Sequence, residues 1–599
     1  MSLISKEEFA NAARLNGFVG NLLARFLMQI LGLGKINKTY QNLQDKKGIE
    51  FIDGIVHTLE LTYEVSDEDL KRIPKEGPFI AISNHPYGGI DGILLIKIIS
   101  QVRPDFKVMA NFMLSKIEPL AEHFFSVNPF DSKTASAGSF AGIKQSLSYL
   151  DAGKSIGIFP AGEVSTYFSD TNQIIDKQWA DSVLKLIKKA QVPVVPIYFV
   201  GTNSWLFHIL GRIHPILRTA KLPSELLNKK GKNIMIRIGN PISVKEQAKY
   251  ADISRYGRYL RARTYALGTP LEVKKFFIPH IKPKSKPEPI IEAVPTAVLS
   301  AEIGKISEKY LLFENKNYKV LCSPSAEIPF LMQEIGRLRE VTFRAIGEGT
   351  NRSFDLDEFD LYYNQLIIWD TEACKLVGAY RIGKGKDIYE QYGAKGFYIH
   401  TLFRLKKPFH SILKESLELG RSFIVEEYQR KPMSLFLLWK GILYFLIKNP
   451  EYRYMIGPVS ISNEFSKFSK NLIVEYLKHY YYNPKLANYV YPRMEYIVEG
   501  DYKVDKEIIF EDASMDVSRI DAIIKDVEQK YSMPVLLKKY LSLNAQLIGF
   551  NIDPKFNDAL DGLILVDIYK IPTAVIETLC KELNDTNLLN RFVFTKEKE

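Results

Sequence analysis

Short apolar runs alternate with helical patterns through the first half of the chain. Runs rich in β-branched residues, typical of buried strands, occur at 78–83, 107–111, 155–159, 194–200 and 234–238. Helical periodicity appears between them at 91–101, 139–150 and 181–190. Strand and helix signals that alternate in this way indicate an α/β fold with a largely parallel central sheet.

The second half mixes the same two signals without regular alternation. Helical patterns occur at 330–343, 411–419, 434–448 and 464–480. Strand patterns occur at 365–370, 375–382, 397–402 and 454–461, and the first two form a hairpin-like pair. This pattern predicts an α+β domain with antiparallel strands.

A proline-rich segment separates the two halves. Five prolines interleaved with lysines lie between Ile278 and Pro295, where neither a helix nor a central strand can form. We therefore predict a first domain at 1–277, a semi-extended linker at 278–299 and a second domain at 300–599.

Composition narrows the partners and excludes several classes of protein. A chain of 599 residues with 46% hydrophobic and 25% charged residues is a multidomain globular protein. The three cysteines lie far apart, which favours a reducing compartment, and the nine histidines form no metal-binding cluster, so we predict no metal site. The net charge of +11 favours an acidic lipid surface or an acidic carrier protein, and no nucleic-acid-binding motif is present.

Two apolar stretches bear on membrane association. Gly17–Leu33 contains Arg25, and Leu435–Ile447 contains Lys440, and both are short for a membrane span. We expect amphipathic or buried helices, and the first stretch suits either the membrane interface or its own domain. No secretory signal is recognised, so we expect a peripheral protein on the cytoplasmic face of a bacterial inner membrane.

His85 follows a predicted buried strand, at the position where parallel sheets expose ligands. Gly88 and Gly89 permit a tight turn, and Asp91 begins the next helix. Such a loop can bring the Asp91 carboxylate to one imidazole nitrogen, so that the other nitrogen can remove a proton from a substrate hydroxyl. The same residues also suit a plain turn with Asp91 as a helix N-cap, and the pattern alone leaves both interpretations open.

Two further blocks follow in order, Phe159-Pro160-Ala161-Gly162-Glu163-Val164-Ser165-Thr166 and the run Val-Pro-Val-Val-Pro-Ile-Tyr-Phe-Val-Gly at 192–201. With the His85 block they resemble the glycerolipid and lysophospholipid acyltransferase family, over roughly residues 51–267. The resemblance implies that His85 is the catalytic base and that Asp91 orients it. It also implies an acyl thioester donor and substrate contacts by four residues, Asn84, Gly162, Glu163 and Ser165.

The chain departs from the family pattern at three places. Five residues instead of four separate His85 from Asp91, and Ala161 replaces a glutamate. Where the family has a phosphate-binding arginine, this chain has Ser132 followed by Lys133, which becomes the substrate-binding candidate. These departures favour a phosphate-free acceptor and resemble a subgroup of lyso-ornithine-lipid O-acyltransferases and hemolysin-named proteins.

A run of arginines lies near the end of the first domain, at Arg255, Arg258, Arg261 and Arg263. On one helix these side chains suit anionic lipid or an acidic acyl carrier protein, and they equally suit a solvated helix face.

Several stretches of the second half carry another resemblance. They are Arg337–Arg339, the acidic block Asp355–Asp360, Val377–Arg381, Glu415–Phe423, Trp439–Gly441, and the regions 534–540 and 556–561. They resemble the N-acyltransferases that make ornithine lipids and, more distantly, acyl-homoserine-lactone synthases, over about residues 300–581. The resemblance implies an N-acetyltransferase-like fold, an acyl carrier protein as donor and no bound cofactor.

An amine must lose its proton before it attacks a thioester, so a base or an acidic clamp is expected. Glu418 is the catalytic candidate, and the substrate-binding candidates are Asp355, Asp357, Asp360, Arg381 and Arg421. The acidic block also suits a solvated loop, and Glu418 also suits a pair with Arg421 on one helix turn. Backbone amides at a splayed strand, which the sequence does not locate, would hold the oxyanion.

Together the two resemblances imply a bifunctional enzyme that makes an acylated amino-acid lipid. The C-terminal domain would transfer a 3-hydroxyacyl group from acyl carrier protein, or from coenzyme A, to the amine of ornithine or a similar amino acid. The N-terminal domain would then acylate the hydroxyl of that lyso-lipid. The alternatives are glycine as the amino acid, a lysophospholipid as the acceptor, and a membrane-lytic, hemolysin-like protein that requires no His/Asp pair.

Overall fold

The computed structural model describes residues 25, 28, 29, 32–111, 117–127, 137–168, 173–213, 215–269, 287–429, 431–498, 506–510, 516–529 and 531–583. Contacts divide the chain into two compact units. Unit 1 comprises Met1–Lys274 and Gly500–Tyr531, and unit 2 comprises Lys275–Glu499 and Ser532–Glu599. The sequence analysis assigned residues 500–531 to the second domain, because a sequence pattern does not specify which core covers a segment.

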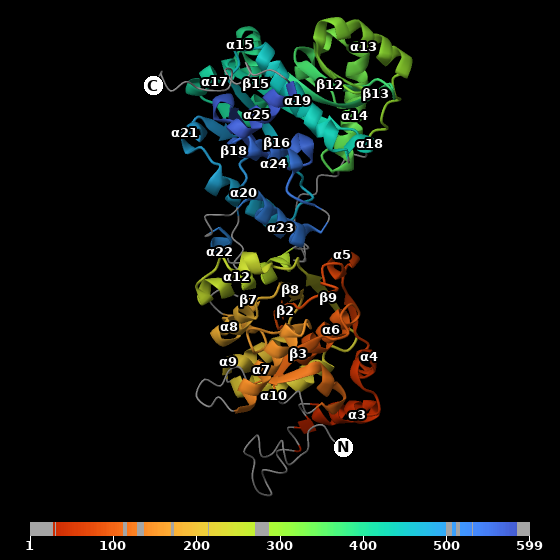
Figure 1. Cartoon of the computed structure of the whole chain (residues 1–599), viewed down its shortest axis with the longest axis vertical. Helices are drawn as coiled ribbons and strands as arrows, with labels where there is room; N and C mark the ends of the chain where they lie inside the picture. Colours follow the sequence, from red (N-terminus) through yellow and green to blue (C-terminus); the bar gives the residue numbers. More distant parts are fainter. Residues whose placement is uncertain are drawn as a thin grey trace. The chain divides into compact units, whose positions relative to one another are not determined.

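Unit 1 is built on a seven-stranded, mainly parallel sheet within the described residues (Figure 1). In spatial order its strands are β1 (Thr62–Glu64), β9 (Asn233–Ile238), β8 (Val194–Phe199), β2 (Ile80–Ser83), β5 (Ile156–Ile158), β3 (Lys107–Asn111) and β4 (Phe124–Val127). Every neighbouring pair is parallel except β8 with β9. The predicted α/β architecture is therefore confirmed.

Helices surround this sheet, and a small hairpin of β6 (Thr166–Phe168) and β7 (Gln173–Ile175) lies apart from it. The helices are α3 (Leu33–Leu43), α4 (Gly48–Thr58), α5 (Asp67–Leu70), α6 (Gly89–Ser100), η2 (Glu118–His123), α7 (Ala137–Asp151), α8 (Asp181–Ala190), α9 (Trp205–Ile213), α10 (Pro215–Leu227), α11 (Val244–Gln247), α12 (Ile253–Ala266), α22 (Lys506–Phe510) and α23 (Val517–Glu528). The predicted strand at 107–111 and helix at 181–190 match the structure to the residue.

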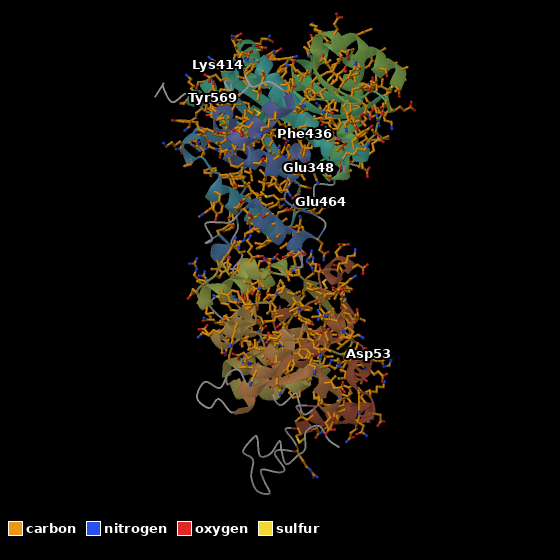
Figure 2. The ribbon with its side chains drawn as sticks, in the orientation of Figure 1. Asp53, Glu348, Lys414, Phe436, Glu464 and Tyr569 are labelled. Carbon is orange, nitrogen blue, oxygen red and sulfur yellow. The ribbon has the colours of Figure 1, made fainter. Side chains whose placement is uncertain are left out.

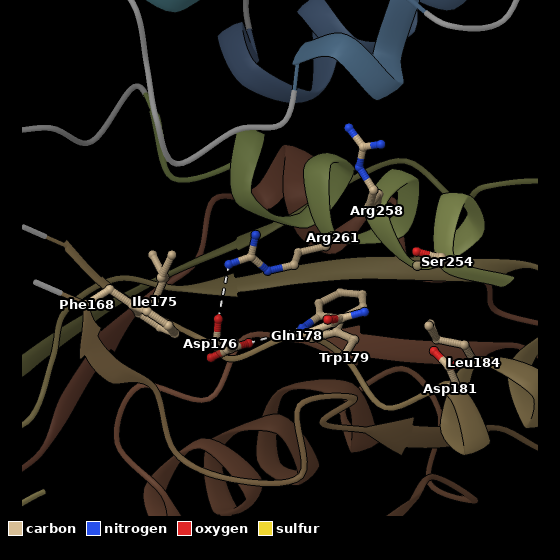
Figure 3. Close-up of a pocket in the computed structure, with 11 residues that line it drawn as sticks. Phe168, Ile175, Asp176, Gln178, Trp179, Asp181, Leu184, Ser254, Arg258 and Arg261 are labelled. Carbon is tan, nitrogen blue, oxygen red and sulfur yellow. Dashed lines mark hydrogen bonds between the residues drawn. The ribbon is translucent and has the colours of Figure 1, made fainter. Parts of the chain in front are cut away.

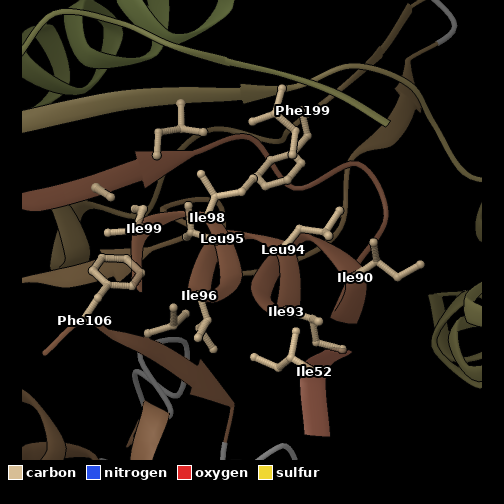
Figure 4. Close-up of a cluster of buried hydrophobic side chains, with 14 of the residues drawn as sticks. Ile52, Ile90, Ile93, Leu94, Leu95, Ile96, Ile98, Ile99, Phe106 and Phe199 are labelled. Atoms are coloured by element: carbon tan, nitrogen blue, oxygen red, sulfur yellow. The ribbon is translucent and has the colours of Figure 1, made fainter. Parts of the chain in front are cut away.

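Helix α6 forms the centre of the unit 1 core (Figure 4). Its apolar side chains are buried around most of its circumference, and they pack with Ile52, Phe106 and Phe199 from three other segments. A helix that is apolar on nearly all sides belongs in an interior. The loop that precedes α6 is consequently anchored at both ends, by the central strand β2 and by a buried helix.

Unit 2 is built on an eight-stranded sheet within the described residues. In spatial order its strands are β10 (Leu311–Asn315), β11 (Tyr318–Pro324), β12 (Asn364–Asp370), β13 (Lys375–Lys384), β15 (Ser416–Ile424), β16 (Tyr454–Ile461), β19 (Ala559–Asp567) and β18 (Gln546–Asp553). Only β15 and β16 pair in parallel among these described strands. The predicted α+β class with antiparallel strands is confirmed.

The remaining elements of unit 2 are mostly short. They are α13 (Thr296–Tyr310), η4 (Ser325–Glu327), α14 (Pro329–Ala345), η5 (Glu358–Leu361), α15 (Gly385–Tyr392), η6 (Gly393–Gly396), α16 (Ile399–Leu402), β14 (Phe403–Leu405), η7 (Lys407–Phe409), α17 (His410–Lys414), α18 (Glu426–Gln429), α19 (Pro432–Lys448), α20 (Lys467–Tyr480), α21 (Pro484–Ala487), β17 (Val490–Pro492), α24 (Val535–Ser542), η8 (Pro554–Phe556), η9 (Ile568–Lys570) and α25 (Thr573–Leu583).

Two predicted elements of unit 2 are wrong. The apolar run 397–402 was expected to be a strand, but its second part is the helical turn α16. The helix expected over 411–419 ends at Lys414, and β15 begins at Ser416. The residues Leu417, Glu418 and Leu419 are all buried, so this strand lacks the alternation by which strands are recognised.

The apolar stretches and the linker are only partly described. The stretch 435–447 lies in α19, which packs on β10, β11, β12 and β13, whereas most of 17–33 lies outside the described residues. Among the described residues, no helix combines the length and apolar character that a membrane crossing requires. Residues 287–295 of the predicted linker form neither helix nor strand, and 270–286 lie outside the described residues.

Candidate active sites

The loop between β2 and α6 brings His85 and Asp91 together. His85 Nδ1 lies 3.0 Å from Asp91 Oδ2, which is within ion-pair distance although the alignment falls short of a regular hydrogen bond. The His85 ring stacks on Phe159, with ring centroids 4.2 Å apart. The His85 side chain is 18% exposed and that of Asp91 is fully buried. One imidazole nitrogen therefore faces a carboxylate in a partly open site.

Backbone amides of the turn hold the Asp91 carboxylate in place. The N–H groups of Tyr87 and Gly88 both donate to Asp91 Oδ2, at 2.9 and 3.0 Å. Gly88 has a φ of 92°, in the left-handed region that only glycine adopts without strain. The turn accommodates the five residues between His85 and Asp91, and the His85–Asp91 distance stays short.

Asn84 lies next to His85, but its side chain points into the fold. Its Nδ2 donates to the carbonyl oxygen of Phe199 at 2.9 Å, and its Oδ1 accepts the Phe199 N–H at 2.8 Å. The Asn84 side chain thereby satisfies both the backbone N–H and the backbone carbonyl of Phe199 on β8. This geometry holds β2 and β8 in register beneath the loop.

Ser165 meets the His85 loop through a residue that the sequence analysis missed. Ser165 Oγ donates to Asp176 Oδ1 at 2.6 Å, and the same oxygen accepts the His85 N–H at 3.2 Å. The Ser165 N–H also donates to the carbonyl oxygen of His85 at 2.9 Å. Burial raises the pKa of the Asp176 carboxyl, and the hydrogen bonds from Ser165 and His85 oppose that rise. Asp176 follows β7 in an irregular segment and carries no motif that would have identified it.

The other candidates of the first domain lie in different surroundings. Glu163 pairs with Arg218 and lies 2.8 Å from Lys177 Nζ, so its carboxylate already has two cationic partners. Gly162 is exposed and has a φ of 67°. Lys133 lies outside the described residues, and its predicted role remains a prediction.

A cavity of about 510 Å³ lies directly behind Asp176 (Figure 3). Its lining residues are Phe168, Ile175, Asp176, Gln178, Trp179, Asp181, Leu184, Ser254, Gly257, Arg258 and Arg261. Trp179 Nε1 donates to Asp176 Oδ2 at 3.3 Å, and Arg261 Nη2 donates to the Asp176 carbonyl oxygen at 3.1 Å. Apolar walls with a guanidinium group beside them suit an apolar chain that carries an anionic group.

The arginines of α12 do not form one exposed face. Arg263 is buried, with its guanidinium 2.7 Å from both Glu246 and Asp526. Arg258 and Arg261 line the cavity, and Arg255 is exposed. The expectation of a basic surface helix is therefore wrong for Arg263. The spacing of arginines in the sequence does not show that Arg263 faces the buried carboxylate of Asp526.

In unit 2 the acidic block pairs with buried arginines. Asp360 lies 2.9 Å from Arg339, Asp357 lies 2.6 Å from Arg381 and 3.2 Å from Arg421, and Asp355 lies 3.1 Å from Arg421. The charges of Arg339 and Arg381, together with hydrogen bonds, outweigh burial and hold the pKa of Asp360 far below its usual range. The five predicted substrate-binding residues of this unit thus lie together, and Arg339 supplies the third cation for their three carboxylates.

Glu418 lies on β15 and is enclosed by protein donors. It accepts hydrogen bonds from the Tyr363 hydroxyl, from the Tyr398 N–H at 3.1 Å and from the Ile399 N–H at 2.7 Å. Arg421 pairs with Asp355 and Asp357 instead of Glu418. Burial raises the pKa of Glu418, although these donors oppose the rise. The Glu418 carboxylate therefore holds the backbone turn at Tyr398 and Ile399 in place.

The parallel strands β15 and β16 pair over three residues and then separate. The paired residues are Ser416–Glu418 and Tyr454–Ile456. Beyond them β15 continues against β13 through an irregularity at Arg421, whose φ is 56°, and β16 continues against β19. Two described strand edges therefore face each other unpaired, which is the type of position where backbone amides can meet an oxyanion.

Three buried carboxyls lie close to this separation. Asp561 on β19 pairs in register with Ser460 on β16, and Ser460 Oγ donates to Glu348 Oε2 at 2.8 Å (Figure 2 labels Glu348). Burial raises the pKa of Asp561 well above its usual range, and the carboxyls of Asp553 and Glu348 raise it further. In the part of the chain that the structure describes, no three His, Cys, Asp or Glu side chains are grouped so that they could hold a metal ion.

Comparison with known families assigns a domain type to each unit. Residues 4–274 match the model of an acyltransferase family, and residues 338–440 match that of the acetyltransferase (GNAT) domain. The chain thus carries an N-terminal acyltransferase domain and a C-terminal GNAT-like domain, and the protein is an acyltransferase.

Two kinds of bacterial enzyme are similar to parts of the chain. A glycine N(alpha)-acyltransferase of Phocaeicola vulgatus is 29% identical over 302 residues, which are 47% of this chain and 90% of the relative. The enzyme of the same name from Bacteroides thetaiotaomicron is also 29% identical, over 47% of this chain and 87% of its own length. A lyso-glycine lipid O-acyltransferase of Bacteroides thetaiotaomicron is 24% identical over 257 residues, which are 42% of this chain and 91% of the relative.

Replacement of Asn84 tests its structural position. Asn84→Ala leaves a buried N–H and a buried carbonyl of Phe199 without partners, so we expect the unfolding free energy of unit 1 to fall by roughly 1–3 kcal/mol. Urea unfolding of the full-length protein measures the change. Asn233→Ala is the matched control, because Asn233 is exposed and its loss should change stability by less than about 0.5 kcal/mol. Equal effects of the two variants would contradict this account.

Proposed function

We propose that this acyltransferase makes a diacylated amino-acid lipid, with glycine as the amino acid. Unit 2 would transfer a 3-hydroxyacyl group to the amine of glycine, and unit 1 would acylate the hydroxyl of the product. The observation that carries the proposal is the similarity of one chain to two enzymes of consecutive steps, each over about nine-tenths of the relative's length. Ornithine is the second candidate amino acid, and the family resemblance of the second half favours it.

For O-acyl transfer, His85 is the base and Asp91 the residue that orients it. The free imidazole nitrogen removes the proton of the lyso-lipid hydroxyl as its oxygen attacks the thioester carbonyl. The buried Asp91 carboxylate stabilises the imidazolium that results. The new ester C–O bond replaces the C–S bond, and His85 returns the proton to the leaving thiolate.

The cavity behind Asp176 suits the lyso-lipid acceptor. An N-acyl amino acid carries a carboxylate and a long apolar chain, which match Arg261 and the apolar walls formed by Trp179 and Leu184. Hydrogen bonds connect Asp176 at the cavity wall to His85 and Ser165. An acceptor bound there would lie next to the loop that carries the base.

For N-acyl transfer, Asp561 is the proposed base in place of Glu418. Its carboxyl has a raised pKa and lies on the strand next to β16, where β15 and β16 separate. The amine would give a proton to Asp561 and form an amide C–N bond as the thioester C–S bond breaks, and Asp561 would pass that proton to the leaving thiolate. Glu418 is enclosed by donors from Tyr363, Tyr398 and Ile399, which favours a structural role.

We also propose that the protein works at the cytoplasmic face of a membrane and takes acyl groups from acyl carrier protein, with coenzyme A thioesters as the alternative donor. Helix α9 supports membrane contact, because Trp205, Leu206 and Ile209 are 73%, 41% and 40% exposed. Arg212 is exposed on the same helix. Exposed tryptophan and aliphatic side chains beside a cation are typical of helices that bind an anionic membrane surface. The helix follows Asn203, whose side chain donates to Tyr87 of the His85 loop at 3.5 Å.

Expression in a bacterium without aminolipids tests the whole proposal. Cells fed isotope-labelled glycine should form a new lipid that carries the label and two acyl chains, as seen by lipid mass spectrometry. Label from ornithine instead would select the second candidate, and the absence of any new aminolipid would contradict both. Purified protein supplied with acyl carrier protein or coenzyme A thioesters identifies the donor.

Loss of the base should separate the two steps. We expect His85→Ala and Asp91→Asn to lower O-acylation by about 10²–10⁴-fold while N-acylation continues, so that the mono-acylated lipid accumulates. His57→Ala is the control, since His57 is exposed on α4 of the same unit. Continued formation of the diacylated lipid by His85→Ala would refute the assignment.

The opposite pattern is expected for Asp561. Asp561→Asn keeps the size of the side chain but removes the base, so N-acylation should fall by about 10²-fold or more. O-acylation of added lyso-lipid should remain, which shows that unit 1 is intact. Asp387→Asn, at an exposed position of α15, serves as the control. An unchanged rate of N-acylation in Asp561→Asn would exclude it as the base.

Vesicle binding tests the role of α9. The triple change Trp205→Ala, Leu206→Ser and Ile209→Ser should weaken binding to phosphatidylglycerol-containing vesicles at least about tenfold, because apolar side chains drive insertion into the interface. Met235→Ser removes an apolar side chain that is 38% exposed on β9, and should have little effect. Equal binding of the triple variant and the wild-type protein would rule out α9 as the membrane contact.

A further inference from the structure

Helix α23 lies in the segment Gly500–Tyr531 of unit 1, and the chain on both sides of this segment belongs to unit 2. Its apolar residues recur at helical spacing and are buried: Ile520, Ile523, Ile524 and Val527. In Figure 1 the blue helices α22 and α23 lie beside the yellow-green α12, and both contact it. A helix with one apolar stripe is stable only where other parts of the protein cover the stripe, and α23 is grouped with unit 1, where it contacts α12.

Asp526 is the polar centre of this packing. Its side chain is 2% exposed, and its Oδ2 lies 2.7 Å from Arg263 Nη2 on α12. Its Oδ1 accepts the Asn240 N–H at 2.7 Å and Asn240 Nδ2 at 2.5 Å. Arg263 is itself buried, so removal of the Asp526 carboxylate would leave a guanidinium with less compensation inside the protein, which is strongly unfavourable.

The C-terminal end of α23 is held by two further arginines. Arg72 Nη2 donates to the carbonyl oxygen of Lys525 at 2.9 Å, and Arg237 Nη2 donates to that of Asp526 at 2.8 Å. Arg237 Nε also lies 2.8 Å from the fully buried Asp69. Cations at the last turn match the partial negative charge of a helix C-terminus.

Helix α12 connects this packing to the His85 loop. Arg261, two residues before Arg263, donates to the carbonyl oxygen of Asp176 at 3.1 Å. The Asp176 N–H donates to the Tyr265 hydroxyl at 2.8 Å, from the same helix. The Asp176 carboxylate in turn accepts the His85 N–H at 3.2 Å. One face of α12 therefore meets α23, and side chains of α12 hold the residue that anchors His85.

We propose that α23 is a positioning element for acyl transfer at His85. Docked α23 fixes α12 through Asp526 and Arg263, and α12 fixes the His85 loop through Asp176. Asp526 is accordingly a positioning residue that does not touch the substrate. The inference rests on the proposed O-acyl transfer at His85, and it makes that step depend on residues that lie within the sequence of the other half.

The test uses the full-length protein and measures amide hydrogen exchange together with both transfer rates. In Asp526→Asn and Asp526→Ala we expect exchange in residues 253–266 to rise, and kcat for O-acylation of added lyso-lipid to fall, each by about tenfold or more. The KM for the lyso-lipid and the rate of N-acylation should change little.

Asp526→Glu, which keeps the charge, should retain more activity than Asp526→Asn. Lys525→Ala is the matched control, because that side chain is 53% exposed on the same helix.

Three outcomes decide between the possibilities. Normal exchange and normal O-acylation in both Asp526 variants would overturn the inference. O-acylation could instead fall only in proportion to the unfolded fraction, with kcat per folded molecule unchanged. That result would show that α23 has only a structural role, and it would also overturn the inference. If Asp526→Ala does not fold, Asp526→Asn and Asp526→Glu provide the comparison. In a further case, amide exchange in α12 rises in the Asp526 variants, but the wild-type protein shows no O-acylation. That result would uphold the docking of α23 and refute the proposed function instead.

Discussion

A carboxylate buried at the start of a helix determines the arrangement of the first active-site loop. Asp91 is fully buried, and a buried carboxylate is costly unless polar groups of the protein replace water around it. The loop supplies the N–H groups of Tyr87 and Gly88, which both donate to Asp91 Oδ2, and His85 Nδ1 lies 3.0 Å from the same oxygen. The turn at Gly88 takes a conformation that suits glycine. The histidine ring then lies flat against Phe159, at the end of the neighbouring strand β5. The position of His85, the proposed base, thus follows from the burial of the neighbouring Asp91 carboxylate.

Buried charges organise unit 2 in a similar way. The acidic block appeared suited to holding a cationic substrate, yet each of its three aspartates meets an arginine from another element. Taking two charges out of water is unfavourable unless their geometry is good, so such pairs restrict how the helix α14 and the strands β13 and β15 can pack. The charged residues with the strongest sequence signal therefore hold the site together, and the base that we propose, Asp561, lies outside the acidic block.

The sequence predicted the elements whose pattern is local. Apolar runs bounded by turns identified β2, β3, β5, β8 and β9 of the unit 1 sheet but not the edge strands β1 and β4. The glycines after His85 indicated the turn that brings Asp91 back to it. It failed where burial is complete, as at Leu417–Leu419, because a strand covered on both faces shows no alternation. It also failed for Asp176 and Asp526, whose importance arises from partners far away in the chain. Long-range pairing of polar groups leaves no periodic signal.

The discontinuous make-up of unit 1 has a consequence for biosynthesis. One of its helices, α23, contacts α12 and leaves the ribosome roughly 250 residues after Lys274. At bacterial elongation rates of about 5–20 residues per second, the first part of unit 1 waits for about 12–50 seconds before its last helix is synthesised. During that interval the surface of α12 that later contacts α23 is without its partner, and Arg263 has Glu246 but not yet Asp526 as a counter-charge. The completed N-terminal acyltransferase unit is thereby restricted to chains whose translation has already passed through most of the GNAT-like half.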